Sequence, residues 1–444
     1  YGGAINTFAK DGFLALILLF SYVFGTQDSA ILRVSGLFGI LTVLLAYLIG
    51  KASFGRRAGL LSSGVLAISV SQLHYSRSGF PQAASVFFLY LAVLIYIFSY
   101  QHLSSLKISN RLLFFSGISL GYAFTCHYNL FWAIPAFIIL EIAAKFLFKK
   151  QIRLNVFLKR LIFLTFGVSI PILFFGGISE LVKLVLNNNS SFREAIRGSL
   201  GIGVFVSYFE RLINFVTPSL SAETLIGNCV YSPGQSASPF YYIKILQVWE
   251  GQFILALLLM GIVFLIYRQF RRRVFNEFIV LTLFLVPFIY WSFHPWQLSR
   301  SFMPAIPAIA LIIGFLLAQI LKKCCNNQSA NNAAVFIILL ILIFQANTRI
   351  KKELSYESGY PSAIRFMREH SGVRHLSSQF TISRSFVGRK NALDISSSFE
   401  GGDPVHKLQG LYDKQGYRYL LLDQMRYAFA DSPVVKAADN SKPI

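Results

Sequence analysis

The chain has 444 residues, of which 55% are hydrophobic, 16% are aromatic and only 14% are charged. This is not the composition of a soluble enzyme. The net charge of +22 does not indicate nucleic-acid binding either, because the basic residues lie in short clusters beside apolar runs, where anionic lipid headgroups are the available partner. The composition therefore predicts a polytopic membrane protein.

Apolar runs long enough to cross about 30 Å of hydrocarbon recur along most of the chain. They lie near residues 30–50, 58–75, 80–99, 111–127, 129–148, 161–178, 251–267, 276–292, 302–321 and 332–347. The predicted fold class is an all-α polytopic membrane protein with about ten visible spans. Because the sequence begins at Tyr1 rather than Met, we expect that its start is either missing or processed.

Every second loop between these runs is basic. The clusters are Lys51 with Arg56 and Arg57; Lys107 with Arg111; Lys145, Lys149, Lys150, Arg153, Lys159 and Arg160; Arg268, Arg271, Arg272 and Arg273; and Lys322 with Lys323. Cytoplasmic loops carry an excess of lysine and arginine, so these loops are expected in the cytoplasm. The intervening turn at 75–79, the segment 179–250 and everything after 348 are then expected on the outer face.

Two regions outside the spans have their own character. Residues 179–250 alternate apolar and polar side chains, as in FVSYFERLINFV, which predicts amphipathic helices at the membrane interface. Residues 348–444 contain the strand-like segments RHLSS and YRYLLLD among helical patterns, which predicts a small extracytoplasmic α/β domain. The transmembrane domain is assigned to 30–347, and 1–29 to an outer juxtamembrane segment.

Motifs along the first three quarters of the chain follow one another in a recognisable order. ILRVSGLFG leads through an apolar run to FGRR, and HYSRSGF closes the next run. Weaker matches follow in GISLGYAFTCHYNLFWAIPA and SRSFMPAIPAIALIIG. With this order and spacing, most of residues 1–321 resembles bacterial members of the dolichyl-phosphate-mannose protein mannosyltransferase family, which are GT-C glycosyltransferases.

The resemblance implies a GT-C membrane fold whose first span precedes Tyr1. It implies an inverting transfer of a sugar from a polyprenyl-phosphate donor to a lipid, glycan or protein acceptor. It also implies a place in the bacterial inner (plasma) membrane, with the active site and the C-terminal domain on the extracytoplasmic side. Which sugar is moved is not indicated.

Such a transfer needs positive charge aimed at the departing phosphate. Basic residues that fall at outer span ends are the predicted donor-phosphate ligands: Lys10, Arg33, Arg77 and Arg300. Further candidates at similar depth are His74, Tyr75, His127, Tyr128 and His294. Taken singly, each arginine can instead extend to lipid headgroups, and each histidine can be a structural hydrogen-bonding residue.

The acceptor hydroxyl or amine needs a carboxylate base within hydrogen-bonding reach. The family's first acidic residue would lie upstream of Tyr1. A second acidic position precedes an amphipathic helix in the family, and FAKDGFLALILLFSYVFG places Asp11 there. Asp11 is therefore the predicted catalytic residue, with an ordinary helix N-cap as the alternative.

Other functions stay open at this stage. A transporter for lipid-linked saccharides would need broken helices in paired halves, and no such pairing is visible in the sequence. A catalytically silent membrane scaffold with a partner-binding C-terminal domain is the third possibility. No cofactor is required by the sequence. A divalent metal ion is possible by analogy with some GT-C enzymes, although no His/Asp cluster with metal-ligand spacing is present.

Overall fold

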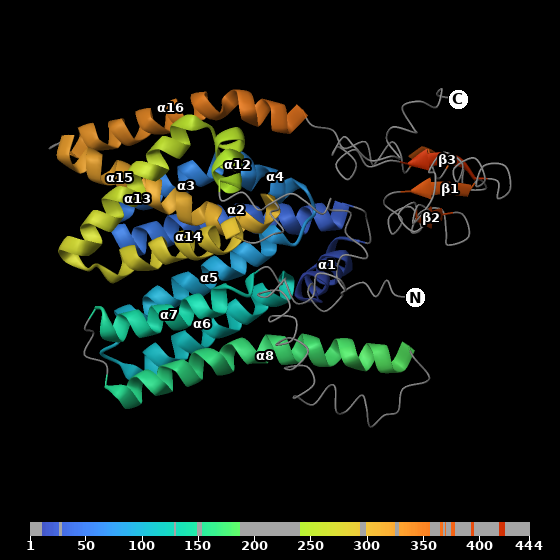
Figure 1. Ribbon diagram of the computed structural model, residues 1–444, viewed down its shortest axis with the longest axis horizontal. Coiled ribbons are helices and arrows are strands. Elements are labelled where there is room, and N and C mark those ends of the chain that lie inside the picture. Colours follow the sequence, from blue (N-terminus) through green and yellow to red (C-terminus); the bar gives the residue numbers. More distant parts are fainter. Residues whose placement is uncertain are drawn as a thin grey trace. The chain divides into compact units, whose positions relative to one another are not determined.

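The computed structural model describes residues 11–25, 29–127, 130–148, 153–186, 240–293, 299–324 and 328–355, together with short stretches between 365 and 421. The chain divides into two compact units. One comprises residues 1–222 with 232–354, and the other comprises 223–231 with 355–444. The first unit is helical and contains every described candidate site residue (Figure 1).

Helices occupy all ten segments predicted as spans. The elements of the first unit are α1 (Asp11–Phe24), α2 (Ser29–Phe54), α3 (Arg56–Ala67), α4 (Val70–Arg77), α5 (Gln82–Gln101), α6 (Leu106–Cys126), α7 (Ala133–Phe146), α8 (Leu154–Leu186), α12 (Tyr241–Trp249), α13 (Gln252–Arg272), α14 (Phe275–Phe293), the 3₁₀ helix η5 (Ser299–Ala305), α15 (Ile306–Cys324) and α16 (Gln328–Ser355). In the described part of the chain, 7 helices are long and apolar enough to cross a membrane. The multi-pass character is thus confirmed, and the count of ten stays a prediction.

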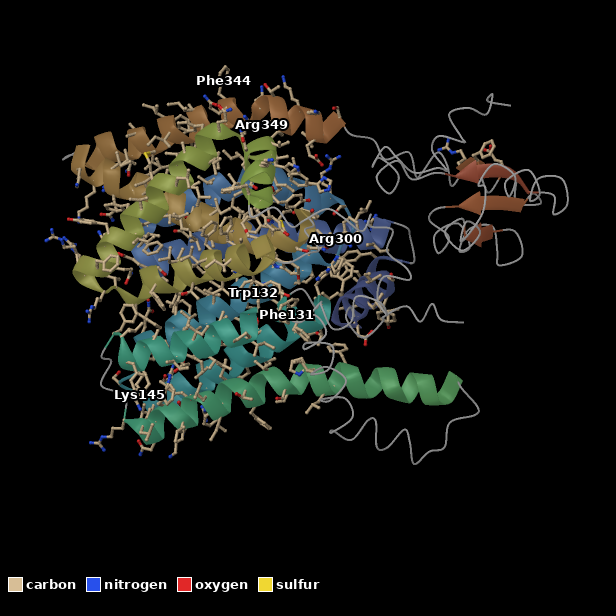
Figure 2. The ribbon with its side chains drawn as sticks, viewed as in Figure 1. Phe131, Trp132, Lys145, Arg300, Phe344 and Arg349 are labelled. Atoms are coloured by element: carbon tan, nitrogen blue, oxygen red, sulfur yellow. The ribbon has the colours of Figure 1, made fainter. Side chains whose placement is uncertain are left out.

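The long helices run up and down the bundle, so that it has two ends (Figure 1). We call the end where α2, α5 and α13 finish the basic end, and the end where α4, α6 and α16 finish the site end. Lys145 lies at the basic end and Arg300 at the site end (Figure 2). This arrangement places the predicted basic loops opposite the predicted site residues, as the alternation of loops requires.

Burial separates central helices from peripheral ones. In the most apolar window of α15, 89% of the residues are buried inside the protein, compared with 17% in α16. The exposed residues of α16 are largely apolar, as at Phe344 and Phe336. An apolar exposed surface of this kind is expected where lipid tails, and not water, surround a helix. The hydrophobic core therefore centres on α15 and its neighbours.

Glycines allow α6 and α8 to approach closely. A Cβ atom added at Gly117 would lie 2.4 Å from the carbonyl oxygen of Leu164, and one at Gly121 would lie 2.3 Å from that of Val168. Neither backbone can give way without breaking its helix. Small residues that bring two backbones together are a common means of packing membrane helices.

The predicted span 58–75 is two helices instead of one. Helix α3 ends at Ala67, and α4 starts after Ser69. Ser69 has an extended backbone, and its side chain caps α4 by accepting a hydrogen bond from the Gln72 N–H. Serine forms such N-caps readily because its hydroxyl oxygen accepts from the first turn of the helix. The predicted outer turn at 75–79 is correspondingly shorter, because Tyr75, Ser76 and Arg77 belong to α4.

The helix predicted after Asp11 is present as α1, but it is not amphipathic. Phe13 and Leu16 are buried, while Leu18, Leu19 and Tyr22 are exposed. A helix that is apolar on its exposed side as well is typical of a lipid-contacting element. Of the segment 179–250, which is predicted to form amphipathic helices, the structure describes the end of α8 and α12, while the stretch 205–216 lies outside the described residues.

The second unit contains a three-stranded sheet of order β2-β1-β3. Its strands are β1 (Arg374–Ser377), β2 (Ala392–Asp394) and β3 (Tyr417–Leu421), and β1 pairs in parallel with both others. β1 and β3 lie within the two segments predicted as strands, whereas β2 was not predicted. Parallel strands need crossover connections, and the helices predicted for these lie mostly outside the described residues. The α/β class and the domain limits at 29, 347 and 348 stay predictions.

Candidate functional site

Asp11 lies at the start of α1, where this helix meets the end of α6. The Tyr122 hydroxyl donates to the carbonyl oxygen of Gly12 over 3.0 Å. A Cβ atom at Gly12 would approach the Thr125 side chain to 2.4 Å, so the two helices touch there. The half-buried Asp11 is therefore held beside the last turn of α6.

The same turn of α6 leads to His127, which connects α6 to α5. The His127 Nε2 atom lies 3.1 Å from Nε2 of Gln82, the first residue of α5. The Ser35 hydroxyl of α2 donates to the Phe80 carbonyl oxygen over 3.1 Å, immediately before α5. His127 is buried, in keeping with a structural or positioning role.

His74 and Arg77 lie on α4 and contact the end of α16. Nδ1 of His74 is 2.8 Å from the Glu353 carboxylate, and Arg77 Nη1 donates to the Glu353 carbonyl oxygen over 3.1 Å. Tyr75 is buried and stacks on Trp249, with ring centroids 5.9 Å apart. The Arg77 side chain is exposed beyond its contact with Glu353. Arg77 is therefore bonded to the end of α16 and is also accessible to a ligand from outside the bundle.

Arg300 occupies the 3₁₀ helix η5 at the site end, and its side chain is exposed. Buried neighbours fix η5: the Tyr90 hydroxyl donates to the Pro304 carbonyl oxygen over 2.9 Å, and Phe302 stacks on Tyr242 with centroids 4.8 Å apart. Arg33, near the start of α2, is exposed too. The predicted residues Lys10, Tyr128 and His294 lie outside the described residues.

Glu250 is a residue of the site end that sequence reasoning missed. Its buried carboxylate accepts hydrogen bonds from the Ser69 hydroxyl and from the start of α4. Arg349, also missed, donates from Nη1 to the Glu250 carbonyl oxygen over 3.1 Å. The signal for Glu250 was its place between Trp249 and the apolar run that begins after Gly251. An acidic residue at a span end marks a candidate for a specific partner.

At the basic end, one residue of the predicted cytoplasmic clusters behaves differently from the others. Arg160 is buried within the bundle, where its guanidinium makes a paired contact with Glu141 at 2.9 and 3.1 Å. Tyr100 donates to the same carboxylate, and Arg160 also donates to Ser109. The positive-inside pattern could not separate Arg160 from its exposed neighbours, because Glu141 lies in the preceding apolar run.

Among the described residues, no group of three or more His, Cys, Asp or Glu side chains is placed to hold a metal ion. A small pocket lies among α3, α13, α15 and α16. Glu250 and Arg349 line it, together with apolar side chains such as Leu66, Ile309 and Leu342. None of the catalytic or phosphate-binding residues predicted from the sequence lines this pocket. The predicted residues share one end of the bundle, and the structure does not assign them to this pocket.

The family comparison matches the part of the chain that carries Arg33, His74, Tyr75, Arg77 and His127. Residues 12–175 match the model of the family described as dolichyl-phosphate-mannose-protein mannosyltransferase. The resemblance predicted from the sequence is confirmed over these residues. No curated protein matches the chain.

Solved structures extend the comparison to the whole chain. The oligosaccharyltransferase AglB of Archaeoglobus fulgidus, in complex with an inhibitory peptide and a dolichol-phosphate, is 15% identical with a TM-score of 0.59 and covers 95% of this chain. ArnT of Cupriavidus metallidurans is 12% identical in the apo state, with a TM-score of 0.53, and covers 96%. The fold of this chain is thus similar to that of both proteins. ArnT bound to undecaprenyl phosphate is also similar, at 11% identity and a TM-score of 0.55.

The chain is shorter than both of these similar structures. The chain spans 62% of the length of AglB, compared with 84% of the length of apo ArnT. At these identities the likeness establishes the fold. The assignment of a reaction therefore depends on the family match and on the residues gathered at the site end.

Proposed function

We propose that this protein is a membrane glycosyltransferase that moves a sugar from a polyprenyl-phosphate donor to an acceptor at the site end of the bundle. One observation carries the proposal. The segment that matches the mannosyltransferase family, residues 12–175, contains α2, α4 and the end of α6, which carry Arg33, Arg77 and His127 at the end of the bundle where Asp11 lies.

The chemistry follows from the charges at this end. The acceptor oxygen or nitrogen attacks the anomeric carbon as the bond from that carbon to the phosphate oxygen breaks, and the carrier phosphate leaves with the electron pair. Attack from the face opposite the leaving group inverts the configuration. Arginines hold the developing phosphate charge through paired N–H donors. Asp11 takes the proton released by the acceptor.

The donor class is supported by two of the similar structures. One contains dolichol-phosphate and the other undecaprenyl phosphate, so both bind a long polyprenyl chain ending in a phosphate. The apolar helices of this protein provide a membrane setting for such a carrier, whose phosphate would lie at headgroup level. For the acceptor, the peptide in the archaeal complex supports a protein, and lipid and glycan acceptors are retained.

We further propose that the site end and the second unit face the extracytoplasmic side of a bacterial plasma membrane. The support is the accumulation of arginine and lysine at the opposite end, as at Lys145 (Figure 2) and at Arg271 in the last turn of α13. Accessibility labelling of engineered cysteines should place positions 149 and 271 inside and positions 190 and 400 outside. Cytoplasmic labelling at position 400 would overturn the orientation.

The reaction is tested on the full-length protein in lipid nanodiscs. A panel of undecaprenyl phosphates carrying different radiolabelled sugars is supplied with membrane extract as the source of acceptor. We expect the label to move to acceptor with release of undecaprenyl phosphate. Movement of intact donor across a vesicle membrane without transfer would support a transporter, and neither binding nor transfer of any donor would support a scaffold.

A further inference from the structure

The start of α4 is capped by a residue that is 180 positions away in the chain. Glu250 Oε1 accepts from the Ser69 hydroxyl at 2.8 Å and from the Ser71 N–H at 3.0 Å, and Oε2 accepts from the Val70 N–H at 3.3 Å. Ser69 in turn accepts from the Gln72 N–H. The free N–H groups of the first turn are thus satisfied, and a negative charge faces the positive end of the helix.

Glu250 is itself fixed from the other side. It is 8% exposed, and Arg349 of α16 donates to its carbonyl oxygen. Gly251 has a φ of +92°, and a Cβ atom there would lie within 2.4 Å of the Arg349 guanidinium. Glycine adopts this conformation readily and leaves space for the arginine. The carboxylate therefore has a defined position relative to α4, α13 and α16.

The C-terminal end of α4 is held by the segment next to Glu250 and by α16. Trp249, next to Glu250, packs edge-on against His74 with centroids 5.0 Å apart. On α16, Glu353 lies one helical turn after Arg349 and contacts both His74 and Arg77. The short helix that carries Arg77 is thus clamped at its start by Glu250 and at its end by Glu353.

We propose that Glu250 is a positioning residue for the donor phosphate, an inference that rests on the proposed glycosyltransferase function. By capping α4, it fixes the direction in which Arg77 leaves the helix. The contact with Glu353 uses one of the five N–H donors of the Arg77 guanidinium. The remaining donors can form the paired contact that arginine makes with phosphate oxygens. Without the cap, the first turn of α4 would no longer be held in place, and Arg77 would lose its fixed position.

The test measures the affinity of the full-length protein in nanodiscs for undecaprenyl phosphate. Glu250→Gln removes the charge and places an NH₂ group where an acceptor is needed, so we expect the Kd to rise about tenfold, the lower part of the range for a lost charge-assisted hydrogen bond. Ser69→Ala, a milder change to the same cap, should raise the Kd by a smaller factor. Glu250→Asp should restore part of the affinity.

A matched control separates positioning from general destabilisation. Glu277 is a second buried carboxylate, and it lies in the first turn of α14 at the basic end, where it pairs with Arg268 at 2.7 Å. Glu277→Gln removes its charge in the same way. Its folded fraction should bind undecaprenyl phosphate with the affinity of the unaltered protein. In the Glu250→Gln background, Arg77→Lys should weaken binding by a smaller factor than in the unaltered protein, because coupled residues are not additive.

The outcomes distinguish the two proposals. An unaltered protein that neither binds undecaprenyl phosphate nor transfers a sugar would overturn the proposed function. An active unaltered protein, together with folded Glu250→Gln and Ser69→Ala variants of normal affinity, would overturn the positioning role alone. If Glu250→Gln does not fold, the graded response of Ser69→Ala and its coupling to Arg77→Lys decide the question.

Discussion

Buried charge is handled differently at the two ends of this bundle. At the basic end, Arg160 and Glu141 are both 0% exposed and satisfy each other together with Tyr100 and Ser109. At the site end, His74 and Glu353 are 26% and 20% exposed, and Arg77 keeps an exposed guanidinium. In the first cluster, the charged groups are bonded to other groups of the protein. In the second, the Arg77 guanidinium has N–H donors that are available to a ligand. In the cluster beside α4, Arg77 therefore keeps donors for the proposed phosphate contact, whereas every guanidinium nitrogen of Arg160 donates within the protein.

The sharpest test of this contrast removes one partner of the buried pair. Arg160→Met leaves Glu141 buried without its counter-ion, and breaking such a pair costs about 3 to 5 kcal/mol of stability. We expect a correspondingly lower unfolding midpoint in mild detergent. Donor affinity per folded molecule should not change. Adding Glu141→Met should recover much of the lost stability, and a double variant as unstable as the single one would contradict a charge-pair origin.

At the site end, the largest expected effect is on catalysis. Asp11→Asn should lower the rate of sugar transfer about a hundredfold, the lower end of the range for general acid–base contributions. Asparagine caps a helix as well as aspartate does, so the unfolding midpoint should not move. A normal rate in single-turnover assays would reassign Asp11 to a cap of α1.

Arg77 is expected to have a comparable or smaller effect, through the donor. Arg77→Lys keeps the charge and loses the planar pair of donors, which should cost about 1.5 to 3 kcal/mol, or 10- to 100-fold in transfer rate. Arg271→Lys, on the basic end, is the matched control and should be silent. If Arg300 meets the same phosphate, Arg300→Lys should act similarly and the double change should be less than additive. Unchanged transfer and donor affinity in Arg77→Lys would leave Arg77 as a headgroup-contacting residue.

The contact between α4 and α16 should have the smallest effect. Glu353→Gln removes the charge facing His74 but leaves the carbonyl oxygen that Arg77 contacts. Because both side chains are partly exposed, the loss should be less than about 1 kcal/mol of unfolding free energy. Chemical denaturation is the suitable measurement. A loss as large as that of Arg160→Met would show that the two ends are stabilised in the same way.

The sequence predicted the helical spans well because each requires a long apolar run, which is visible locally. It placed Asp11, Arg77 and Arg300 correctly at one end, since alternation of basic loops determines the direction of each span. It could not reveal the break before α4, because Ser69 looks like any polar residue within a span. Nor could it find the partners of that helix. Glu250, Arg349 and Glu353 lie far from α4 in sequence, and packing alone brings them to it.

The central claim is that a polyprenyl phosphate is held at the site end of the bundle. A photoactivatable undecaprenyl phosphate analogue, with its reactive group beside the phosphate, can be cross-linked to the full-length protein in nanodiscs and located by peptide mapping. We predict labelling in the peptide that contains α4 and the turn to Gln82, reduced in Arg77→Lys and competed by undecaprenyl phosphate. Labelling confined to peptides of the basic end, such as that containing Arg268 and Glu277, would contradict the account.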